Sequence, residues 1–188
     1  MLITRTPLRI SIGGGGTDLP SFYRRRGGFV ISAAINKYMF IALNRTFTDD
    51  YLLKYSELER VRSLDAVQHR IIREVLSRHE IEPGVEIVSL ADIPSGTGLG
   101  SSGAFTVGLL RAIYAHKRAH VTAQALADEA AHIEIEVLGE PIGKQDQYIA
   151  AFGGLTCFEF HPDGQVTVTP LAISTGTLQE PLCLDKHR

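Results

Sequence analysis

The chain carries several short runs in which apolar residues alternate with polar ones or dominate outright. Such runs are typical of β-strands, because successive side chains of a strand point to opposite faces. Strands are therefore expected at 8–12, 29–35, 38–44, 51–55, 85–90, 154–160 and 165–171. The last two are expected to form a hairpin around the sequence His-Pro-Asp-Gly.

Elsewhere the apolar residues recur with the period of an amphipathic helix. The pattern predicts one helix over 64–79, with arginines between its apolar positions and Pro83-Gly84 after its end. It predicts a second helix from about 102 to 117 and a third from Thr122, a suitable N-cap, to Leu138. The order of these elements indicates one mixed α+β domain with no internal repeat.

The composition of the chain indicates no particular function, but it argues against several classes of partner and site. Lys and Arg number 19 against 21 Asp and Glu, a formal charge of −2, which favours neither nucleic acid nor an anionic membrane as a partner. No apolar run reaches the ~18 residues of a membrane span. Cys157 and Cys183 form no CxxC pair and no disulfide framework. A cytoplasmic protein that acts on small molecules is the expectation.

The most unusual stretch is Ile-Pro-Ser-Gly-Thr-Gly-Leu-Gly-Ser-Ser-Gly-Ala-Phe at 93–105. Gly98, Gly100 and Gly103 match the spacing of a dinucleotide-binding fingerprint, but a second helix, not a strand, is expected after the first. A P-loop is excluded because Ser101 stands where that motif needs lysine. Glycines that turn backbone amides inward, followed by a helix N-terminus, indicate instead a cradle for phosphate.

One acidic residue falls on an apolar stripe. Leu126, Ala130, Glu134 and Leu138 follow one another at four-residue steps on the third predicted helix, so Glu134 should face the core. A buried carboxylate must be neutralised, paired or metal-bound. Glu134 is therefore either a helix-end residue that reaches solvent or a Mg²⁺ ligand near the phosphate cradle.

Three further charged residues follow or precede glycine-rich turns. Asp146, in Gly-Lys-Gln-Asp-Gln, is either a helix-start residue that satisfies backbone donors or a general base. Asp18 follows the run Gly-Gly-Gly-Gly-Thr and is positioned to accept hydrogen bonds from a polyhydroxyl ligand. Arg9, on the preceding strand, shares the parity of Arg5, and both are expected at a solvated edge or beside a ligand loop.

With these residues in view, the chain resembles the GHMP kinase superfamily, which includes galactokinase, homoserine kinase, mevalonate kinase and phosphomevalonate kinase. The stretch 94–104 is similar to the signature phosphate loop, and 5–18 is similar to the N-terminal sugar-binding motif. The glycine run and Gly-Lys-Gln-Asp-Gln-Tyr look most like the bacterial heptose kinases acting on D-glycero-D-manno-heptose 7-phosphate. The resemblance covers roughly residues 3–171. It implies an N-terminal domain like domain 2 of ribosomal protein S5, with a left-handed β-α-β unit.

The resemblance also implies a role for each matching residue. The catalytic residues would be Asp146 as base and Arg9 as the group that helps activate the hydroxyl. Mg²⁺ would be held by Ser102 and Glu134. ATP would be bound by Pro94, Gly96, Gly98, Leu99, Gly100, Ser101 and Ser102. The sugar would be bound by Arg5, Gly15, Gly16, Thr17, Asp18 and Gln147. In the implied reaction, the anomeric hydroxyl attacks the γ-phosphate of ATP in line.

A sugar 7-phosphate would need a basic partner. Arg24, Arg25, Arg26 and Lys144 are the candidates, but three adjacent arginines are typical of a solvated helix end, and none is assigned.

The chain departs from the superfamily in one respect. Members usually have a C-terminal domain with a third glycine-rich motif, and 174–188 contains no such motif. We expect residues 1–171 to form the N-terminal domain and 172–188 to be an atypical tail at the start of a missing C-terminal domain. Such a chain should bind ATP weakly and turn over poorly.

Several hypotheses stay open beside a heptose-phosphate kinase. One is a kinase for another sugar, such as fucose, galactose or unphosphorylated heptose. Another is an inactive remnant that binds a nucleotide, associates with itself or complements a separate C-terminal domain.

Overall fold

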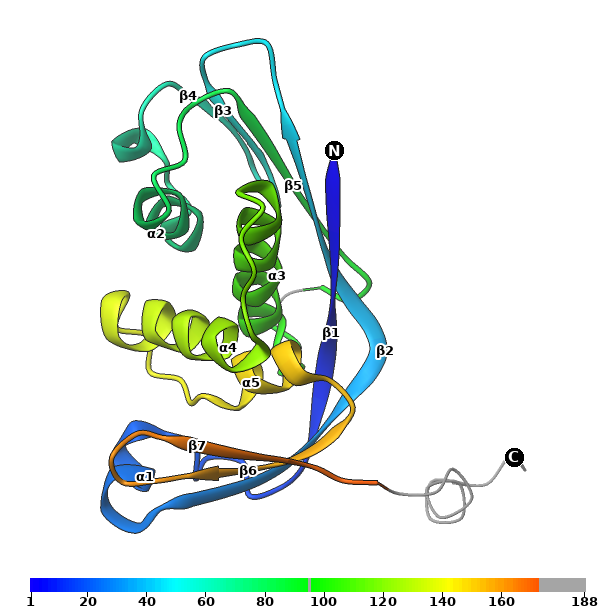
Figure 1. Ribbon diagram of the computed structural model, residues 1–188, viewed down its shortest axis with the longest axis vertical. Coiled ribbons are helices and arrows are strands. Elements are labelled where there is room, and N and C mark those ends of the chain that lie inside the picture. Colours follow the sequence, from blue (N-terminus) through cyan, green and yellow to red (C-terminus); the bar gives the residue numbers. More distant parts are fainter. Residues whose placement is uncertain (95, 173–188) are drawn as a thin grey trace, which may run out of the picture.

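A computed structural model describes residues 1–94 and 96–172, and these form a mixed α+β structure around one large sheet (Figure 1). The predicted fold class is therefore confirmed. Residues 173–188, which hold most of the expected tail and Cys183, lie outside the described residues, as does Ser95. The strands are β1 (Leu2–Gly13), β2 (Gly28–Arg45), β3 (Tyr51–Lys54), β4 (Leu58–Val61), β5 (Val85–Ala91), β6 (Leu155–Phe160) and β7 (Val166–Pro170).

The long strand β2 organises the sheet. The sheet has the order β4-β3-β5-β2-β6-β7, and β1 pairs with β2 outside this path. The second half of β2 pairs with β5, its first half pairs with β6, and β1 runs antiparallel to most of its length. Only β3 and β5 pair in parallel among the described strands. One strand thus connects the two ends of the sheet.

The structure joins two predicted strands. The runs 29–35 and 38–44 belong to the single strand β2, which has neither glycine nor proline where they meet. The ladder is nevertheless irregular there, because Pro7 pairs with Tyr38 while Arg9 pairs with Ala34. Three residues of β2 therefore oppose Leu8 alone, which is a bulge that bends a strand without ending it.

The helices are α1 (Pro20–Arg26), η1 (Leu64–Ala66), α2 (Arg70–Arg78), α3 (Ser101–His116), α4 (Ala123–Ala131), η2 (His132–Val137) and α5 (Gln145–Phe152). The prediction of one helix over 64–79 was wrong at its start. Glu59 accepts hydrogen bonds from the backbone amides of Gln68 and His69, and this pulls the chain out of helical geometry before α2 begins.

The third predicted helix was also only partly right. It is α-helical over α4 and then forms a π-helix, η2, in which the amide of Leu138 donates to the carbonyl of Ile133, five residues back. No strand was expected at β4, and α1 and α5 were considered only as a possible helix end at 24–26 and a possible helix start at Asp146; these elements are four, seven and eight residues long.

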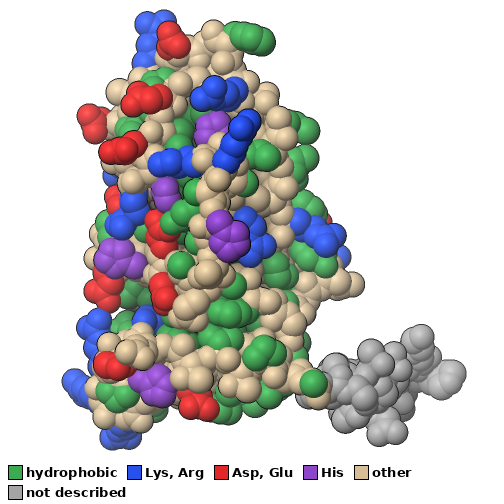
Figure 2. Space-filling model, in the orientation of Figure 1, with side chains coloured by type: hydrophobic (Ala, Val, Ile, Leu, Met, Phe, Trp, Pro, Cys, Tyr) green, Lys and Arg blue, Asp and Glu red, His purple; other side chains and the backbone are tan. Residues whose placement is uncertain are grey.

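Helices α2, α3, α4 and α5 pack on one side of the sheet, as Figure 1 shows. The core between these layers is apolar, and α3 contributes Val107, Leu109, Leu110 and Ile113 with no exposed surface. Acidic and basic side chains are interspersed over the face seen in Figure 2, in keeping with the small net charge. Among the described residues, no helix has both the length and the apolar character that a membrane span requires.

Candidate functional site

The glycine-serine loop enters α3 through left-handed backbone. Gly96, Gly98 and Gly100 have φ values of +81°, +73° and +77°, a region that side chains with a Cβ rarely adopt. Gly100 is the N-cap of the 16-residue α3 and makes no side-chain cap bond. The first amides of a helix lack partners within it and carry its positive dipole end. The loop therefore presents backbone donors where an anion can bind.

Arg9 fixes this loop to the sheet. Its backbone amide donates to the carbonyl of Leu99 at 3.0 Å, and its Nη1 donates to the carbonyl of Gly98 at 2.6 Å. The same guanidinium reaches Asp146, with Nε 2.7 Å and Nη2 2.5 Å from Oδ1. Arg9 thus connects β1, the loop and α5, and both of its contacts with Asp146 go to a single carboxylate oxygen.

Two glycines let the start of α3 lie directly against α5. A Cβ on Gly103 would come within 2.7 Å of Asp146 Cβ and within 3.0 Å of the backbone nitrogen of Gln147. A Cβ on Gly100 would lie 3.1 Å from Arg9 Cγ and 3.2 Å from Asp146 Cγ. Because these two positions are glycines, Asp146 can lie close to the N-terminal end of α3.

Glu134 lies on the other side of the same helix start. It is part of η2, has no exposed surface, and accepts a hydrogen bond from Ser102 Oγ at 2.5 Å through Oε2. Gln147 Nε2 donates to Oε1 at 2.9 Å. Burial raises the pKa of Glu134, although both of these hydrogen bonds act in the opposite direction. The expectation that Glu134 faces the core is confirmed.

Asp146 is a quarter exposed and lies at the start of α5. Burial raises the pKa of Asp146, while the charge and hydrogen bonds of Arg9 oppose this rise. A carboxylate that is ionised beside a guanidinium but partly desolvated has the properties of a general base.

Asp18 connects the N-terminal glycine loop to α5. Its carboxylate is 6% exposed and accepts hydrogen bonds from the amides of Gly16 and Gln145, both at 3.0 Å. A Cβ on Gly143 would lie 1.9 Å from Asp18 Oδ2, so glycine is required there. Thr17 Oγ1 donates to the loop and to β2, at the carbonyls of Gly14 and Phe29. Gly15 and Gly16 are exposed at the tip.

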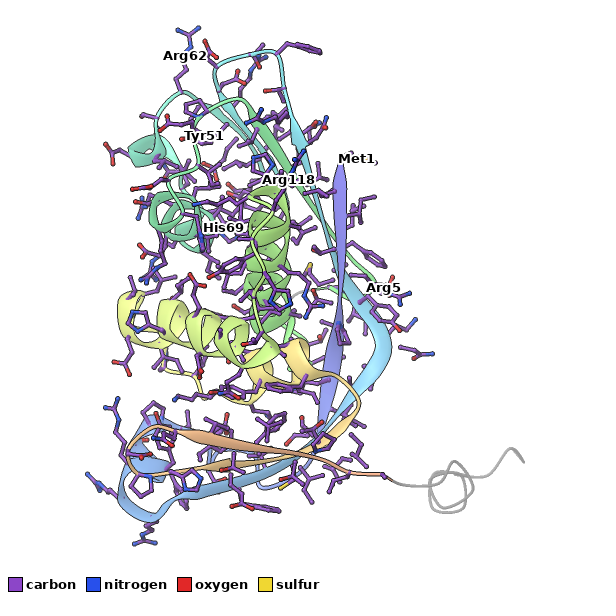
Figure 3. The ribbon with its side chains drawn as sticks, in the orientation of Figure 1. Met1, Arg5, Tyr51, Arg62, His69 and Arg118 are labelled. Atoms are coloured by element: carbon purple, nitrogen blue, oxygen red, sulfur yellow. The ribbon has the colours of Figure 1, made fainter. Side chains whose placement is uncertain are left out.

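The structure does not bring Arg5 or Gln147 to a substrate-facing position. Arg5 is exposed on β1, with its guanidinium 4.6 Å from the centre of the Tyr38 ring, on the side of the sheet away from α3 in Figure 3. The β1–β2 bulge separates Arg5 from Arg9, which explains why their common parity does not place them together. Gln147 has no exposed surface and contacts Glu134 instead.

Two of the basic residues considered for a sugar phosphate, Arg24 and Lys144, lie close to acidic side chains. Arg24 Nη2 lies 2.9 Å from Glu136 Oε1, and Lys144 Nζ donates to the carbonyl of Gly164 at 2.7 Å. Both line a hollow that also contains Asp128, Glu136 and Asp163. This mixed charge does not favour an anion.

A pocket of about 600 Å³ beside the loop has no counterpart among the sequence expectations. His69 stacks on Phe105 with ring centres 4.9 Å apart, and Tyr55 meets His69 edge-on at 4.7 Å. His69 projects between α2 and α3 in Figure 3. The pocket is also lined by Met39, Leu90, Ile93, Pro94, Gly96 and Ser102. These residues come from four separate stretches of the chain, which no spacing in the sequence connects.

The oxygens of Ser102 and Glu134 fit a hard cation. Among residues 1–94 and 96–172 there is no group of three or more His, Cys, Asp and Glu side chains that could hold a metal ion unaided. A hydroxyl and one carboxylate at a phosphate-binding helix start are instead the partial ligand set that Mg²⁺ adopts when phosphates and water complete its shell. The buried Glu134 has no cationic partner among the described salt bridges, which leaves its charge to be neutralised.

Comparison with known proteins agrees with this arrangement. Residues 62–154 match the family described as GHMP kinases N terminal domain. The chain is 30% identical over 192 residues to a D-glycero-alpha-D-manno-heptose 7-phosphate kinase of Campylobacter jejuni, covering 94% of this chain and 56% of the relative. It is 28% identical over 157 residues to a galactokinase of Thermotoga petrophila, covering 79% of this chain and 43% of that one.

A solved structure, a D-glycero-D-manno-heptose 1-phosphate kinase from Bacteroides thetaiotaomicron, superposes with a TM-score of 0.87 at 27% identity. The match covers 95% of this chain and 63% of that protein. The chain therefore spans about half the length of the curated relatives it matches.

Proposed function

Because this chain belongs to the GHMP kinase superfamily and carries its N-terminal domain, we propose that it takes part in ATP-dependent phosphorylation of a sugar hydroxyl. The observation that supports this most strongly is the cluster at the start of α3. There a glycine-rich anion cradle, the Ser102–Glu134 oxygen pair and the Asp146–Arg9 pair all meet.

ATP is proposed to lie across the loop. Its triphosphate would meet the amides of Gly96 to Ser102 and the positive end of α3. The apolar pocket beside the loop has room for a nucleoside, and the His69–Phe105 stack supplies an aromatic wall for a base. Pro94 and Leu99 would flank the nucleotide from the loop.

Mg²⁺ is proposed to bind to Ser102 Oγ and Glu134, where it would neutralise negative charge on the phosphate oxygens. The buried Glu134 carboxylate would then have a cation beside it. The side chains around it hold the carboxylate in place before any ligand arrives.

Asp146 is proposed to accept the proton of the acceptor hydroxyl. Arg9 occupies Oδ1, which leaves Oδ2 to face the substrate. The acceptor oxygen then forms a bond to the γ-phosphorus as the bond to the bridging oxygen of ADP breaks, so the proton ends on Asp146 and ADP carries the leaving electron pair. Arg9 also opposes the rise that burial causes in the pKa of Asp146, and it fixes the phosphate loop beside it.

The proposed acceptor is the anomeric hydroxyl of D-glycero-D-manno-heptose 7-phosphate, in nucleotide-activated heptose synthesis in the cytoplasm. It is supported by the names of the Campylobacter and Bacteroides relatives, both heptose phosphate kinases. Gly15, Gly16 and Asp18 would hold the sugar beside α5. Galactose is the second candidate, favoured by the Thermotoga galactokinase relative.

Two measurements on this chain test the proposal. Titration with a non-hydrolysable ATP analogue should show binding that strengthens when Mg²⁺ is added, and Glu134→Gln should abolish the strengthening. Phosphorus NMR should detect a new sugar 1-phosphate ester from ATP and heptose 7-phosphate. Binding that ignores Mg²⁺ would overturn the kinase assignment, whereas faster phosphorylation of galactose would establish the second candidate.

A further inference from the structure

Gln147 has a buried side-chain amide that connects α5 to Glu134. Gln147 follows Asp146 directly on α5 and has no exposed surface. Its Nε2 donates to Glu134 Oε1 at 2.9 Å. Its Oε1 is buried too and has no hydrogen-bond partner among the described residues. The opposite amide orientation would set Oε1 against a carboxylate oxygen, so Glu134 fixes the direction of the amide.

This arrangement is poor for stability alone. A buried acceptor without a partner destabilises the folded chain, and an apolar side chain of similar volume would avoid that cost. The contact instead constrains Glu134: Gln147 holds Oε1 from α5 while Ser102 holds Oε2 from α3. Two donors on the two oxygens, from two different helices, fix the plane of the carboxylate.

We propose that Gln147 is a positioning residue for the cation site. By occupying Oε1, it directs Oε2, the oxygen beside Ser102 Oγ, toward the cation. This inference rests on the proposed function, in which Ser102 and Glu134 hold Mg²⁺. It also gives the first turn of α5 two tasks, since Asp146 faces the acceptor and its neighbour orients the metal ligand.

The packing around α5 supports this division. Gly103 lies against both Asp146 and the backbone nitrogen of Gln147, so the start of α3 and the first turn of α5 move together. The π-helix η2 carries Glu134 into the space between them. A shift of α5 would therefore alter the base and the metal ligand at once.

The test measures metal affinity separately from nucleotide affinity. Mn²⁺ binding to the 188-residue chain is followed by electron paramagnetic resonance with a saturating non-hydrolysable ATP analogue, and analogue binding is measured again in EDTA. Gln147→Met should weaken Mn²⁺ binding about tenfold, the usual scale for outer-shell partners, and leave metal-free analogue binding within twofold.

Gln124→Met is the matched control. Gln124 also carries an amide that donates to a side chain of α5, the hydroxyl of Tyr148, but it does not touch Glu134. Its loss should leave Mn²⁺ affinity unchanged. Gln147→Asn, which withdraws the amide by one methylene, serves if the methionine variant does not fold, and should also lose Mn²⁺ affinity.

The outcomes separate this inference from the proposed function. An unchanged Mn²⁺ affinity in the Gln147 variants, or an equal loss of metal-free analogue binding, would overturn the positioning role. A wild-type chain whose analogue binding does not depend on metal would overturn the proposed function itself.

Discussion

Two glutamates from one continuous stretch of helix, Glu129 of α4 and Glu134 of η2, lie near opposite ends of α3 and differ in the groups that face their carboxylates; Glu129 is partly buried and Glu134 has no exposed surface. Near its C-terminal end, Glu129 lies 2.9 Å from His79 Nε2 and accepts a hydrogen bond from the Tyr114 hydroxyl at 2.7 Å. Burial alone would raise the pKa of Glu129, but these two contacts bring it below its usual value. Both oxygens of the Glu129 carboxylate therefore have a partner within the protein.

Near the N-terminal end of α3, five residues further along, Glu134 receives only neutral donors and its pKa is raised. The same side chain on the same helix thus serves two purposes. Glu129 fastens α2, α3 and α4 together, whereas Glu134 stays short of a positive charge. The contrast shows that two acids on one stretch of helix can have different surroundings: Glu129 has a histidine and a tyrosine against it, whereas Glu134 has no cationic partner among the described salt bridges.

The largest effect is expected from a change at Asp146, which should affect the rate of phosphoryl transfer and leave nucleotide binding intact. Asp146→Asn removes the proton acceptor, so we expect phosphoryl transfer to fall about 10²- to 10⁴-fold with binding of the ATP analogue nearly unchanged. Transfer rates and analogue titrations measure the two quantities. Asp163→Asn, at an exposed carboxylate in the β6–β7 turn, should leave both unchanged. Equal rates for the two variants would remove Asp146 from the mechanism.

The next effect concerns the close packing of the N-terminal end. Gly103→Ala would press a methyl group on the backbone of α5, and we expect the free energy of unfolding to fall by about 3 kcal/mol. Gly108→Ala, on the same helix, meets the side chains of Thr6 and Ile41 and should cost about 1 kcal/mol. Urea denaturation compares the two. A Gly108 variant less stable than the Gly103 variant would contradict the described contact.

A smaller effect is expected at Glu129, whose contacts with His79 and Tyr114 should stabilise the fold. Glu129→Gln removes a partly buried carboxylate that contacts His79 and accepts a hydrogen bond from Tyr114, so we expect the free energy of unfolding at pH 7 to fall by about 2 kcal/mol. Because the pKa of Glu129 is lowered in the folded state, its stabilisation is present above its usual pKa and is lost as the pH falls below that value. The difference between wild type and variant, from denaturation at several pH values, should therefore shrink in acid.

The smallest effect should have the opposite sign. Because the pKa of Glu134 is raised in the folded state, stability falls as the pH rises from its usual pKa toward the raised one. Glu134→Gln removes this loss, so unfolding at pH 7 should require about 1 kcal/mol more. The same titration series tests it. Destabilisation at pH 7 would mean that the two glutamates are equivalent.

Sequence patterns predicted the parts of the site that depend on neighbouring residues. The loop, the start of α3 and the burial of Glu134 followed from glycine spacing and from the apolar stripe. The reason for the Glu134 position did not, since η2 interrupts the α-helical period that the stripe assumes.

Contacts of the candidate site between segments far apart in the sequence could not be predicted from sequence patterns. Arg9 and Asp146 are 137 residues apart, and only the family resemblance suggested that they act together. The aromatic wall of the pocket had no sequence signal, because Tyr55 follows β3, His69 is the N-cap of α2 and Phe105 belongs to α3. Gln147 and Arg5 were assigned to the sugar, but tertiary packing places one in the core and the other on the far face of the sheet.

The pairing of β2 with β6 has a consequence for how the protein forms during synthesis. Residues 28–33 cannot pair with β6 until residues 155–160 have been synthesised, and these emerge from the ribosome more than 120 positions later. Contacts so distant along the chain slow folding and leave strand edges open in the meantime. Asp146 and Gln147 precede β6 by only a few residues. The proposed site is thus completed at almost the same moment as the sheet, so nucleotide binding at this site, as proposed, would require β6 to be in place.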